Sequence, residues 1–313
     1  MTTANETAFS EAGLARELTL TERIIRSSTQ FVRRYPLGAF GAIFVFILIL
    51  MAIAPGLFTN IDPTLQVLRD RFQSPSAEHW FGTDQLGRDM YSRIIYGANT
   101  SIIVGFGVVI VSASLATFLG VLSGYFGGWF DTMFQRFVDI GIALPGLIFI
   151  ILFITSVPKI PLIPISEEKE EMVPIILSVA LLLAIRLSRV IRSGAISVRE
   201  EQYVEAARAL GAGHRRIMFR HVVPNVMALV LVAASIEVGA AILIESALAF
   251  LGYGIPPPTP SWGRMLNEAR QEIVRTPHMA IFPGLAIFFT VYSFNMLGDA
   301  VRDKMDPRLR GSR

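Results

Sequence analysis

The side chains that most often carry out enzymatic chemistry are scarce in this chain. It has no cysteine, so thiol nucleophiles, disulfides and thiolate metal sites are excluded. Its four histidines never stand in the HExxH spacing of a zinc protease. None of its three lysines follows a glycine, as the lysine of a phosphate-binding P-loop does. We therefore expect no catalytic site, no metal site, no bound cofactor and no ATP site of its own.

Glu237 and Glu245 are the acidic residues with the most unusual surroundings, because each lies in a long apolar run. An acid near the centre of a bilayer costs about 3 kcal/mol on insertion scales and usually faces a helix bundle or a water-filled path. The two residues are eight positions apart and therefore on roughly the same helix face. We interpret them as lining a substrate route, where they would attract an ammonium group or a metal cation. Structural pairing, a bond across a subunit interface and, for Glu245, a gating role stay open as alternatives.

Asp139 and Arg186 form a second candidate pair, with a structural rather than a chemical role. Asp139 begins one apolar run and Arg186 ends the next, so both are expected near the same membrane surface. We predict an ion pair between them.

These residues can act only where helices hold them, and the apolar runs predict those helices. The chain has 313 residues, of which 52% are hydrophobic and only 17% charged, with a mean hydropathy of +0.53, whereas a soluble domain has about 25% charged residues. A spanning helix needs about 20 largely apolar residues. The runs of that length are Leu37–Leu57, Ser101–Gly124, Val138–Val157, Val173–Val190, Val226–Leu251 and Ile281–Leu297. The sequence therefore predicts an all-α polytopic membrane protein with six transmembrane helices, kinked at Pro145 and Pro283.

The basic residues predict which way these helices cross the membrane. With six spans, 19 of the 28 lysines and arginines fall on the side of both termini and nine on the other side. Positive residues favour the cytoplasmic side, so both termini are predicted inside. Residues 1–36 are expected to be a retained cytoplasmic tail, since the first apolar run starts too late and is too long for a cleaved signal peptide. Residues 37–100 would hold the first helix and an outer loop, 101–302 a transport core, and 303–313 a second cytoplasmic tail.

The loop of residues 197–225, predicted to be cytoplasmic, carries the strongest functional pattern. Ser197 and Glu200 have the spacing of a capping box and predict a helix start. A narrow face with small residues at its centre follows at i, i+3, i+4 and i+7. Gly211 is expected to end that helix, and a second, basic helix is expected from about 214 to 222. The members of the narrow face are Tyr203, Ala206, Ala207 and Leu210.

Such a hairpin can either lie on anionic membrane lipid or dock into a partner. A helix that only lies on headgroups presents bulky apolar residues to the lipid. The small alanines beside Glu205 and Arg208 suit close packing in a protein groove better. We favour a docking element.

The sequence of this loop also resembles that of a known family. Glu205-Ala206-Ala207, Gly211 after three further residues and the subsequent Pro224 are similar to the EAA loop of bacterial ABC-import permeases. The string 203–225 resembles the second ("C") permease subunit of the dipeptide, oligopeptide and nickel branch. His221 and Val223 depart from the general EAA pattern, in which isoleucine and leucine stand. Five further segments resemble the same branch, in chain order: Phe81–Asp89, Gly124–Trp129, Ile244–Gly252, Pro257–Gly263 and Leu297–Asp299 with Asp306–Arg310.

The resemblance implies a type I ABC importer fold and a role as a transport subunit without enzymatic activity. The loop would be the coupling helix that docks on a cytoplasmic ATPase, with Glu205 pairing a basic group and Gly211 allowing a sharp turn. The residues expected to serve this coupling are Tyr203, Glu205, Ala206, Ala207, Leu210, Gly211 and Pro224.

The same resemblance implies partners and a place in the cell. The chain would sit in the bacterial cytoplasmic (inner) membrane as one half of a heterodimer with a homologous permease. Two ABC ATPase subunits would use ATP and Mg²⁺, and an extracytoplasmic solute-binding protein would deliver the substrate; no nucleic acid is involved. Di- or oligopeptides are the expected substrates. Nickel or another small solute is the alternative within this class, and an ion-coupled carrier that uses Glu237 and Glu245 is the alternative outside it.

Overall fold

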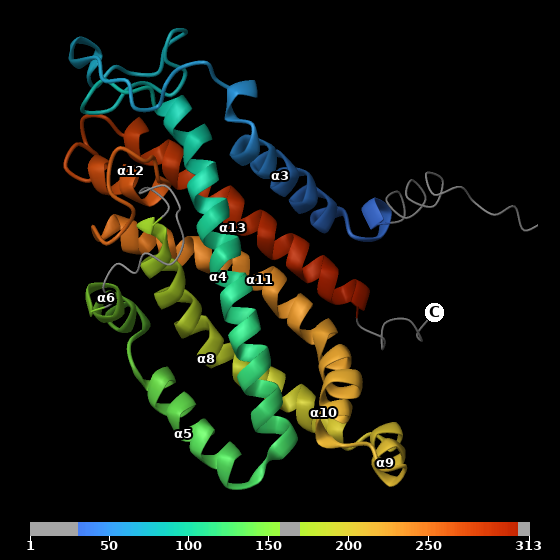
Figure 1. Ribbon diagram of the computed structural model, residues 1–313. Coiled ribbons are helices and arrows are strands. Elements are labelled where there is room, and N and C mark those ends of the chain that lie inside the picture. The colour runs from blue at the N-terminus through green and yellow to red at the C-terminus, as the bar shows by residue number, and fades with distance from the viewer. Residues whose placement is uncertain (1–30, 157–169, 306–313) are drawn as a thin grey trace, which may run out of the picture.

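Helices that pack lengthwise make up most of this molecule (Figure 1). A computed structural model describes residues 31–156 and 170–305. Most of the predicted tails 1–36 and 303–313 therefore lies outside the described residues. The element order is α3 (Pro36–Ile53), α4 (Met90–Phe126), α5 (Gly128–Ala143), α6 (Gly146–Ser156), α8 (Met172–Arg199), α9 (Gln202–Ala209), α10 (His214–Ile217), a π-turn (Met218–Val222), α11 (Val223–Phe250), α12 (Trp262–Ala269) and α13 (His278–Met305), with short 3-10 turns at Pro55–Leu57 and Leu68–Asp70.

Within residues 31–156 and 170–305, five stretches of helix are long and apolar enough to cross a membrane, and a bent pair provides up to one more. Four of the five are α3, α4, α8 and α13, and the fifth runs from His214 to Phe250. The all-helical membrane architecture predicted from the sequence is confirmed.

The third predicted span, Val138–Val157, is not one straight helix. α5 and α6 meet there at a bend of 100°. Leu144 has an extended ψ of 135°, the conformation that a following proline favours, and Pro145 has no N–H with which to continue the helix. The predicted kink at Pro145 is therefore a full break, whereas α13 continues through Pro283 as one helix.

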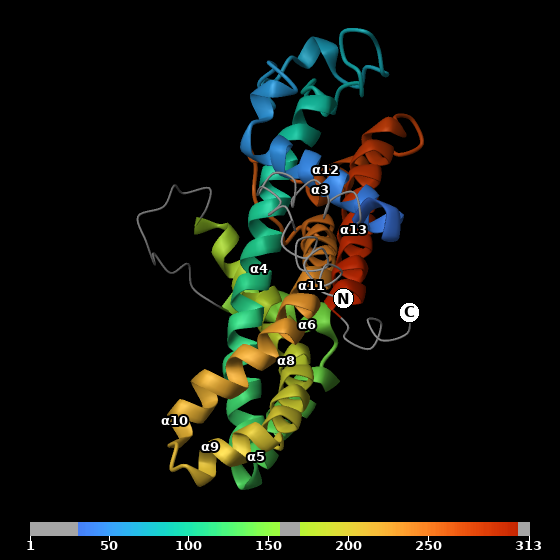
Figure 2. The same cartoon turned by 90° about the vertical axis from the view of Figure 1, so that its right-hand side faces the viewer.

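α4 is much longer than the run that predicted it and connects the two ends of the molecule (Figures 1 and 2). It begins 11 residues before Ser101 because Asp89 caps it: its carboxylate accepts a hydrogen bond of 2.8 Å from Ser92 N. It ends where Gly127 and Gly128 turn the chain with φ of +66° and +61°. At one end lie residues 58–89 and α12, called the loop end below. At the other lie α9 and α10, called the hairpin end.

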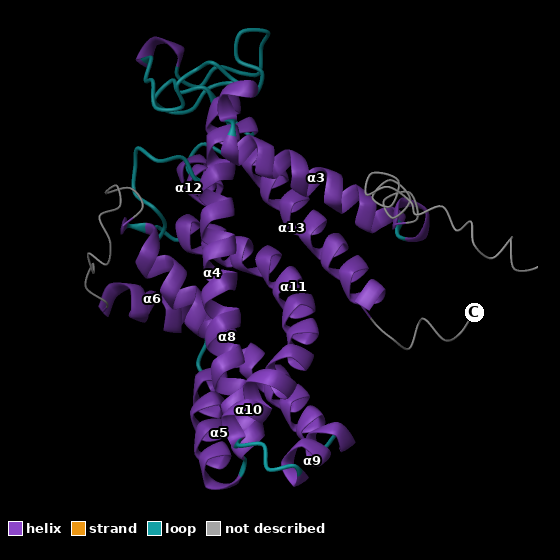
Figure 3. Cartoon of the chain, turned by 45° about the vertical axis from the view of Figure 1, so that its right-hand side comes forward, coloured by secondary structure: helices purple, strands orange, loops and turns teal. Residues whose placement is uncertain are grey.

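α4 and α8 pack closely because glycines face the neighbouring backbone. A Cβ on Gly120 would lie 2.7 Å from Ser188 O, and one on Gly124 would lie 2.7 Å from Arg192 O. Small residues allow this approach between membrane helices. Figure 3 shows that α3 and α13 lie side by side next to α4 and that most of the irregular chain gathers at the loop end. One apolar cluster fills the loop-end half, and a second, which includes Tyr125, Val204 and Ile217, lies at the hairpin end.

Candidate functional site

Residues 200–222 project from the hairpin end of the molecule (Figure 2). They are called the coupling hairpin below, after the role that the resemblance implies. Tyr203, Glu205, Ala206 and Leu210 are exposed, and Leu210 is 89% exposed. Val204 is fully buried in the same short helix. Of the predicted face, Tyr203, Ala206 and Leu210 are therefore open to a partner and Ala207 is half-buried. The buried Val204 anchors the helix to the body of the protein.

The start of this hairpin differs from the sequence prediction. Ser197 still belongs to the last turn of α8, and Glu200 is the residue that ends it. The predicted capping box is therefore wrong, because α8 extends nine residues beyond Val190. α9 instead follows Glu201, whose backbone is extended.

Gly211 closes the turn after α9 as predicted, and for a conformational reason. Its φ is +82°, and the N–H groups of Gly211 and Ala212 donate to Arg208 O and Ala207 O at 2.9 and 3.0 Å. A Cβ at Gly211 would meet nothing within 4 Å. The left-handed backbone, rather than crowding, is what requires glycine here.

The second arm of the hairpin does not end before the membrane span. α10 passes through the π-turn Met218–Val222 directly into α11. Pro224 lies in the first turn of α11, a position at which a missing N–H is tolerated. Within the hairpin, partial burial raises the pKa of Tyr203, and the Glu201 carboxylate raises this pKa further.

The predicted ion pair between Asp139 and Arg186 is wrong in its basic partner. Asp139 pairs with Arg189, and both side chains are more than 40% exposed. Arg186 and Arg189 lie three residues apart and so on neighbouring positions of one helix face. Which of the two arginines reaches Asp139 depends on how α5 packs against α8. The sequence of α8 alone does not determine that packing.

Glu237 lies where α11 meets α4. Its Oε2 accepts a hydrogen bond of 3.2 Å from Ser112 Oγ, and the residue is only partly buried. The residue is therefore not sealed between the two helices, which is compatible with the predicted role along a route.

Glu245 has different surroundings. It is fully buried, and its carboxylate accepts hydrogen bonds from Ser261 Oγ at 3.0 Å and Ser246 Oγ at 3.4 Å. In this structure Glu245 faces no open route, because the segment that precedes α12 covers it, and its contacts fit the structural alternative. It links α11 to that segment instead.

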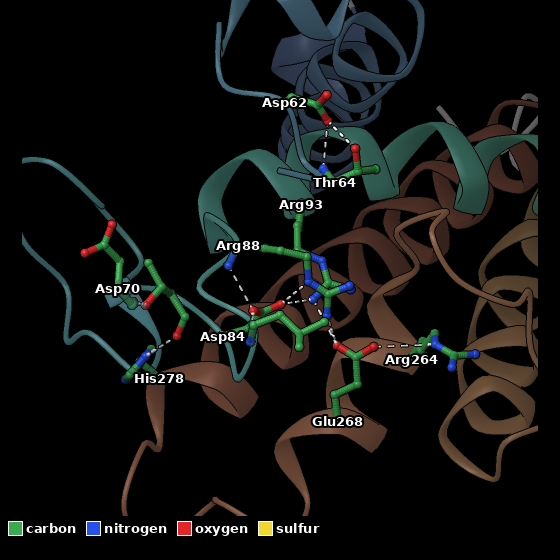
Figure 4. A network of polar contacts seen from close by, with 11 residues as sticks. Asp62, Thr64, Asp70, Asp84, Arg88, Arg93, Arg264, Glu268 and His278 are labelled. Atoms are coloured by element: carbon green, nitrogen blue, oxygen red, sulfur yellow. Dashed lines mark hydrogen bonds and ion pairs between the residues drawn. The ribbon is translucent and has the colours of Figure 1, made fainter. Parts of the chain in front are cut away.

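A buried network of arginines and carboxylates at the loop end was not predicted (Figure 4). Asp84 Oδ2 accepts from Arg88 Nε at 2.6 Å and also pairs with Arg93. Glu268 of α12 binds the same two arginines, Arg88 at 2.8 Å and Arg93 at 2.9 Å. Arg264 lies 3.5 Å from the other oxygen of Glu268. Asp84, Arg88 and Arg93 lie in or beside the segment Phe81–Asp89, but Glu268 lies 180 residues beyond Arg88, so only the fold reveals the network.

Two cavities adjoin these features. One of about 430 Å³ lies over the network and is lined in part by Arg88, Arg264 and Gln271. Another of about 270 Å³ lies between α9 and the end of α4, lined by Tyr125, Phe126, Arg199, Glu200, Glu205, Arg208 and His214. Among residues 31–156 and 170–305, no group of three or more acidic or histidine side chains is placed to hold a metal ion.

Comparison with known proteins places this arrangement in a family. Residues 116–311 match the family described as "Binding-protein-dependent transport system inner membrane component". The chain is 37% identical to the dipeptide transport system permease protein DppC of Alkalihalophilus pseudofirmus, over 91% of this chain and 90% of that protein. It is 37% identical to the glutathione transport system permease protein GsiD of Pectobacterium atrosepticum, over 90% of each.

A third relative, GsiD of Escherichia coli, is 36% identical over 89% of each chain. The long matches cover both the coupling hairpin and the loop-end network. The ion-coupled carrier considered from the sequence is set aside by this membership. The chain belongs to the inner-membrane components of binding-protein-dependent transport systems, as a multi-pass permease subunit of an ABC importer that is not itself an ATPase.

Proposed function

We propose that this chain is the second permease subunit of an importer for peptides, driven by ATP hydrolysis in partner subunits. The single observation that carries the proposal is the coupling hairpin. Its outward residues Tyr203, Glu205, Ala206 and Leu210 are exposed while Val204 is buried. A short, firmly anchored helix with a free face of small residues suits insertion into a groove of another protein.

The partners follow from the same interpretation. A homologous permease pairs with this chain as a heterodimer, and two ABC ATPase subunits that use ATP and Mg²⁺ bind the two coupling hairpins. An extracytoplasmic binding protein delivers the substrate to the loop end. The hairpin end is then cytoplasmic, as are both termini, in agreement with the excess of arginine on that side.

Peptides are the preferred substrate class for two reasons. The names of the relatives concern a dipeptide and glutathione, which is itself a small peptide. In addition, Glu237 is a partly buried acid where α11 meets α4, and in this proposal its carboxylate attracts the ammonium group of a peptide. Nickel or another small solute is the second candidate, since the same carboxylate attracts a metal cation.

Uptake by cells that carry the intact transport system tests the proposal. Radiolabelled dipeptide, glutathione and nickel are offered separately, first with the ion gradient collapsed and ATP maintained, then with the gradient intact and ATP depleted. Dipeptide or glutathione uptake that survives the first condition and stops in the second supports an ATP-driven peptide importer. Uptake of nickel alone would refute the peptide assignment, and dependence on the gradient would refute the coupling to ATP.

A further inference from the structure

At its two ends and near its middle, α4 makes polar contacts with parts of the chain that are distant in sequence. The helix has 37 residues from Met90 to Phe126, which corresponds to about 55 Å at 1.5 Å per residue. It contains no proline, the commonest cause of a sharp kink. It also contains five glycines, and it is nevertheless one unbroken helix from Met90 to Phe126.

Through one residue, Tyr125, the hairpin end of α4 is bonded to the second arm of the coupling hairpin and to the end of α8, where the first arm starts. Its hydroxyl lies 2.9 Å from Nδ1 of His214, the first residue of α10, and the two rings meet edge to face. Its backbone carbonyl accepts a hydrogen bond of 3.1 Å from Arg199 at the end of α8. Tyr125 is only 4% exposed, in the same apolar cluster as Val204. The hairpin is thus joined to α4, although neither of its chain connections leads there.

The middle of α4 contacts the candidate route. Ser112 lies 13 residues from Tyr125, about 20 Å along the helix, and its hydroxyl donates to Glu237 of α11 at 3.2 Å. A shift of α4 along its axis therefore moves the hydroxyl that donates to Glu237, the partly buried acid that we propose lines the route.

The loop end of α4 is bonded to α12. Arg93, in the first turns of α4, pairs with Glu268 of α12 at 2.9 Å and with Asp84 (Figure 4). Trp262 at the start of α12 donates from Nε1 to Ile94 O at 3.0 Å. Gly97 permits this approach, since a Cβ there would lie 2.9 Å from the indole. α12 and the loop 58–89 are therefore held to α4 by buried charges that are costly to separate.

The coupling hairpin is also connected to the loop end directly along the chain, through α11, but this connection differs from the one through α4. Between α10 and α11 lies the π-turn Met218–Val222, in which the regular helical bonding is interrupted. The route through α4 has no such turn between Tyr125 and Arg93.

We propose that Tyr125 and His214 are positioning residues of the transport cycle, whose hydrogen bond fastens the coupling hairpin to α4. α4 then carries the movement of the hairpin past Glu237 to the ion-pair network and α12 at the loop end. The inference rests on the proposed function in one respect, namely that an ATPase moves the hairpin.

The test measures conformational change at the loop end in response to ATP bound at the hairpin end. The chain has no cysteine of its own, so Gln271→Cys gives it a single thiol. Gel electrophoresis separates this chain from its partner subunits, and the label on its band then reports residue 271 alone. Gln271 is exposed and lines the cavity over the network. The rate of maleimide labelling is measured in the whole complex, purified through a tag on this chain, with and without ATP, Mg²⁺ and vanadate.

We expect ATP to change the labelling rate by about threefold or more in the otherwise native chain. Tyr125→Phe removes only the hydroxyl, whereas His214→Leu removes the ring nitrogens together with the edge-to-face ring contact. Each should reduce that response by about three- to tenfold, the range expected for one lost hydrogen bond. His214→Asn, which keeps a polar atom near the position of Nδ1, should restore it. Tyr292→Phe is the matched control, because no partner of the Tyr292 hydroxyl is found among the described residues, and it should keep the full response.

Hydrolysis of ATP by the same preparations separates this inference from the proposed function. We expect hydrolysis to persist in Tyr125→Phe and His214→Leu, with less substrate imported per ATP consumed. An undiminished labelling response in both variants would overturn the role of this hydrogen bond and leave the proposed function standing. So would the lack of any ATP response at Gln271 in a native complex that hydrolyses ATP. A native complex in which no ATPase is retained would instead refute the proposed function.

Discussion

Asp131 of α5 and Arg192 of α8 are joined by a hydrogen bond of 2.5 Å between Oδ1 and Nε, and a second contact links Oδ2 to Nη2. Ser123 of α4 donates to the same carboxylate. One acidic side chain thus holds three helices together at the hairpin end, close to the turn formed by Gly127 and Gly128.

Two acidic residues of α5 are expected to differ in their contribution to stability. Asp131→Asn should lower stability by about 1–3 kcal/mol, because it weakens a bidentate, charge-assisted contact that is largely shielded from water. Asp139→Asn should cost only about 0.2–1 kcal/mol, since Asp139 and Arg189 are both more than 40% exposed. Thermal unfolding of the detergent-solubilised protein measures both.

The identity of the partner of Asp139 can be tested in the same assay. A double-mutant cycle between Asp139→Asn and Arg189→Gln should give a small favourable coupling energy, whereas the cycle with Arg186→Gln should give a value near zero. The reverse order would mean that Arg186 is the true partner.

Val204 and Leu210 separate the anchoring of α9 from its docking. Val204→Ala removes buried methyl groups and should destabilise the hairpin by about 1–2 kcal/mol. Amide hydrogen exchange in α9 should then become faster. Leu210→Ala alters a side chain that is 89% exposed, so exchange should stay unchanged while the ATPase is retained less well on a tagged chain. Equal effects of both changes on exchange would contradict the division between an inner and an outer face.

The membrane class could be predicted from the sequence, because a run of about 20 apolar residues has the length needed to cross a bilayer and few soluble helices repeat it. The coupling hairpin and the turn at Gly211 could also be located, since both depend on local patterns. Features that depend on register or on distant segments could not. The choice of Arg189 over Arg186 depends on how α5 packs on α8, and the bond between Arg93 and Glu268 crosses 175 residues. The burial of Glu245 depends on Ser261 in another segment.

Gly211 and Gly213 form a matched pair for the turn of the hairpin. Gly211→Ala should cost about 1–2 kcal/mol locally, because a side chain is disfavoured at a φ of +82°. Gly213 has a φ of −69°, and a Cβ there would meet nothing within 4 Å, so Gly213→Ala should be tolerated. The amount of substrate imported per ATP hydrolysed is measured in proteoliposomes. We expect Gly211→Ala to lower this ratio and Gly213→Ala to leave it close to the native value. Equal transport by the two variants would argue against the coupling role of this turn.

Glu268 is expected to be the most sensitive acidic residue at the loop end. It faces Arg88, Arg93 and Arg264 and is only 12% exposed. Replacing it with glutamine leaves the buried guanidinium groups of Arg88 and Arg93 with Asp84 as their remaining carboxylate, and a broken buried ion pair costs about 3–5 kcal/mol. Glu268→Gln should therefore lower the melting temperature clearly. Glu272→Gln is the control, because the Glu272 carboxylate makes no ion pair within the described part of the chain, and it should melt like the native protein. If Glu268→Gln melts like that control, the network contributes little to stability, and the loop 58–89 must be held against α12 by apolar contacts instead.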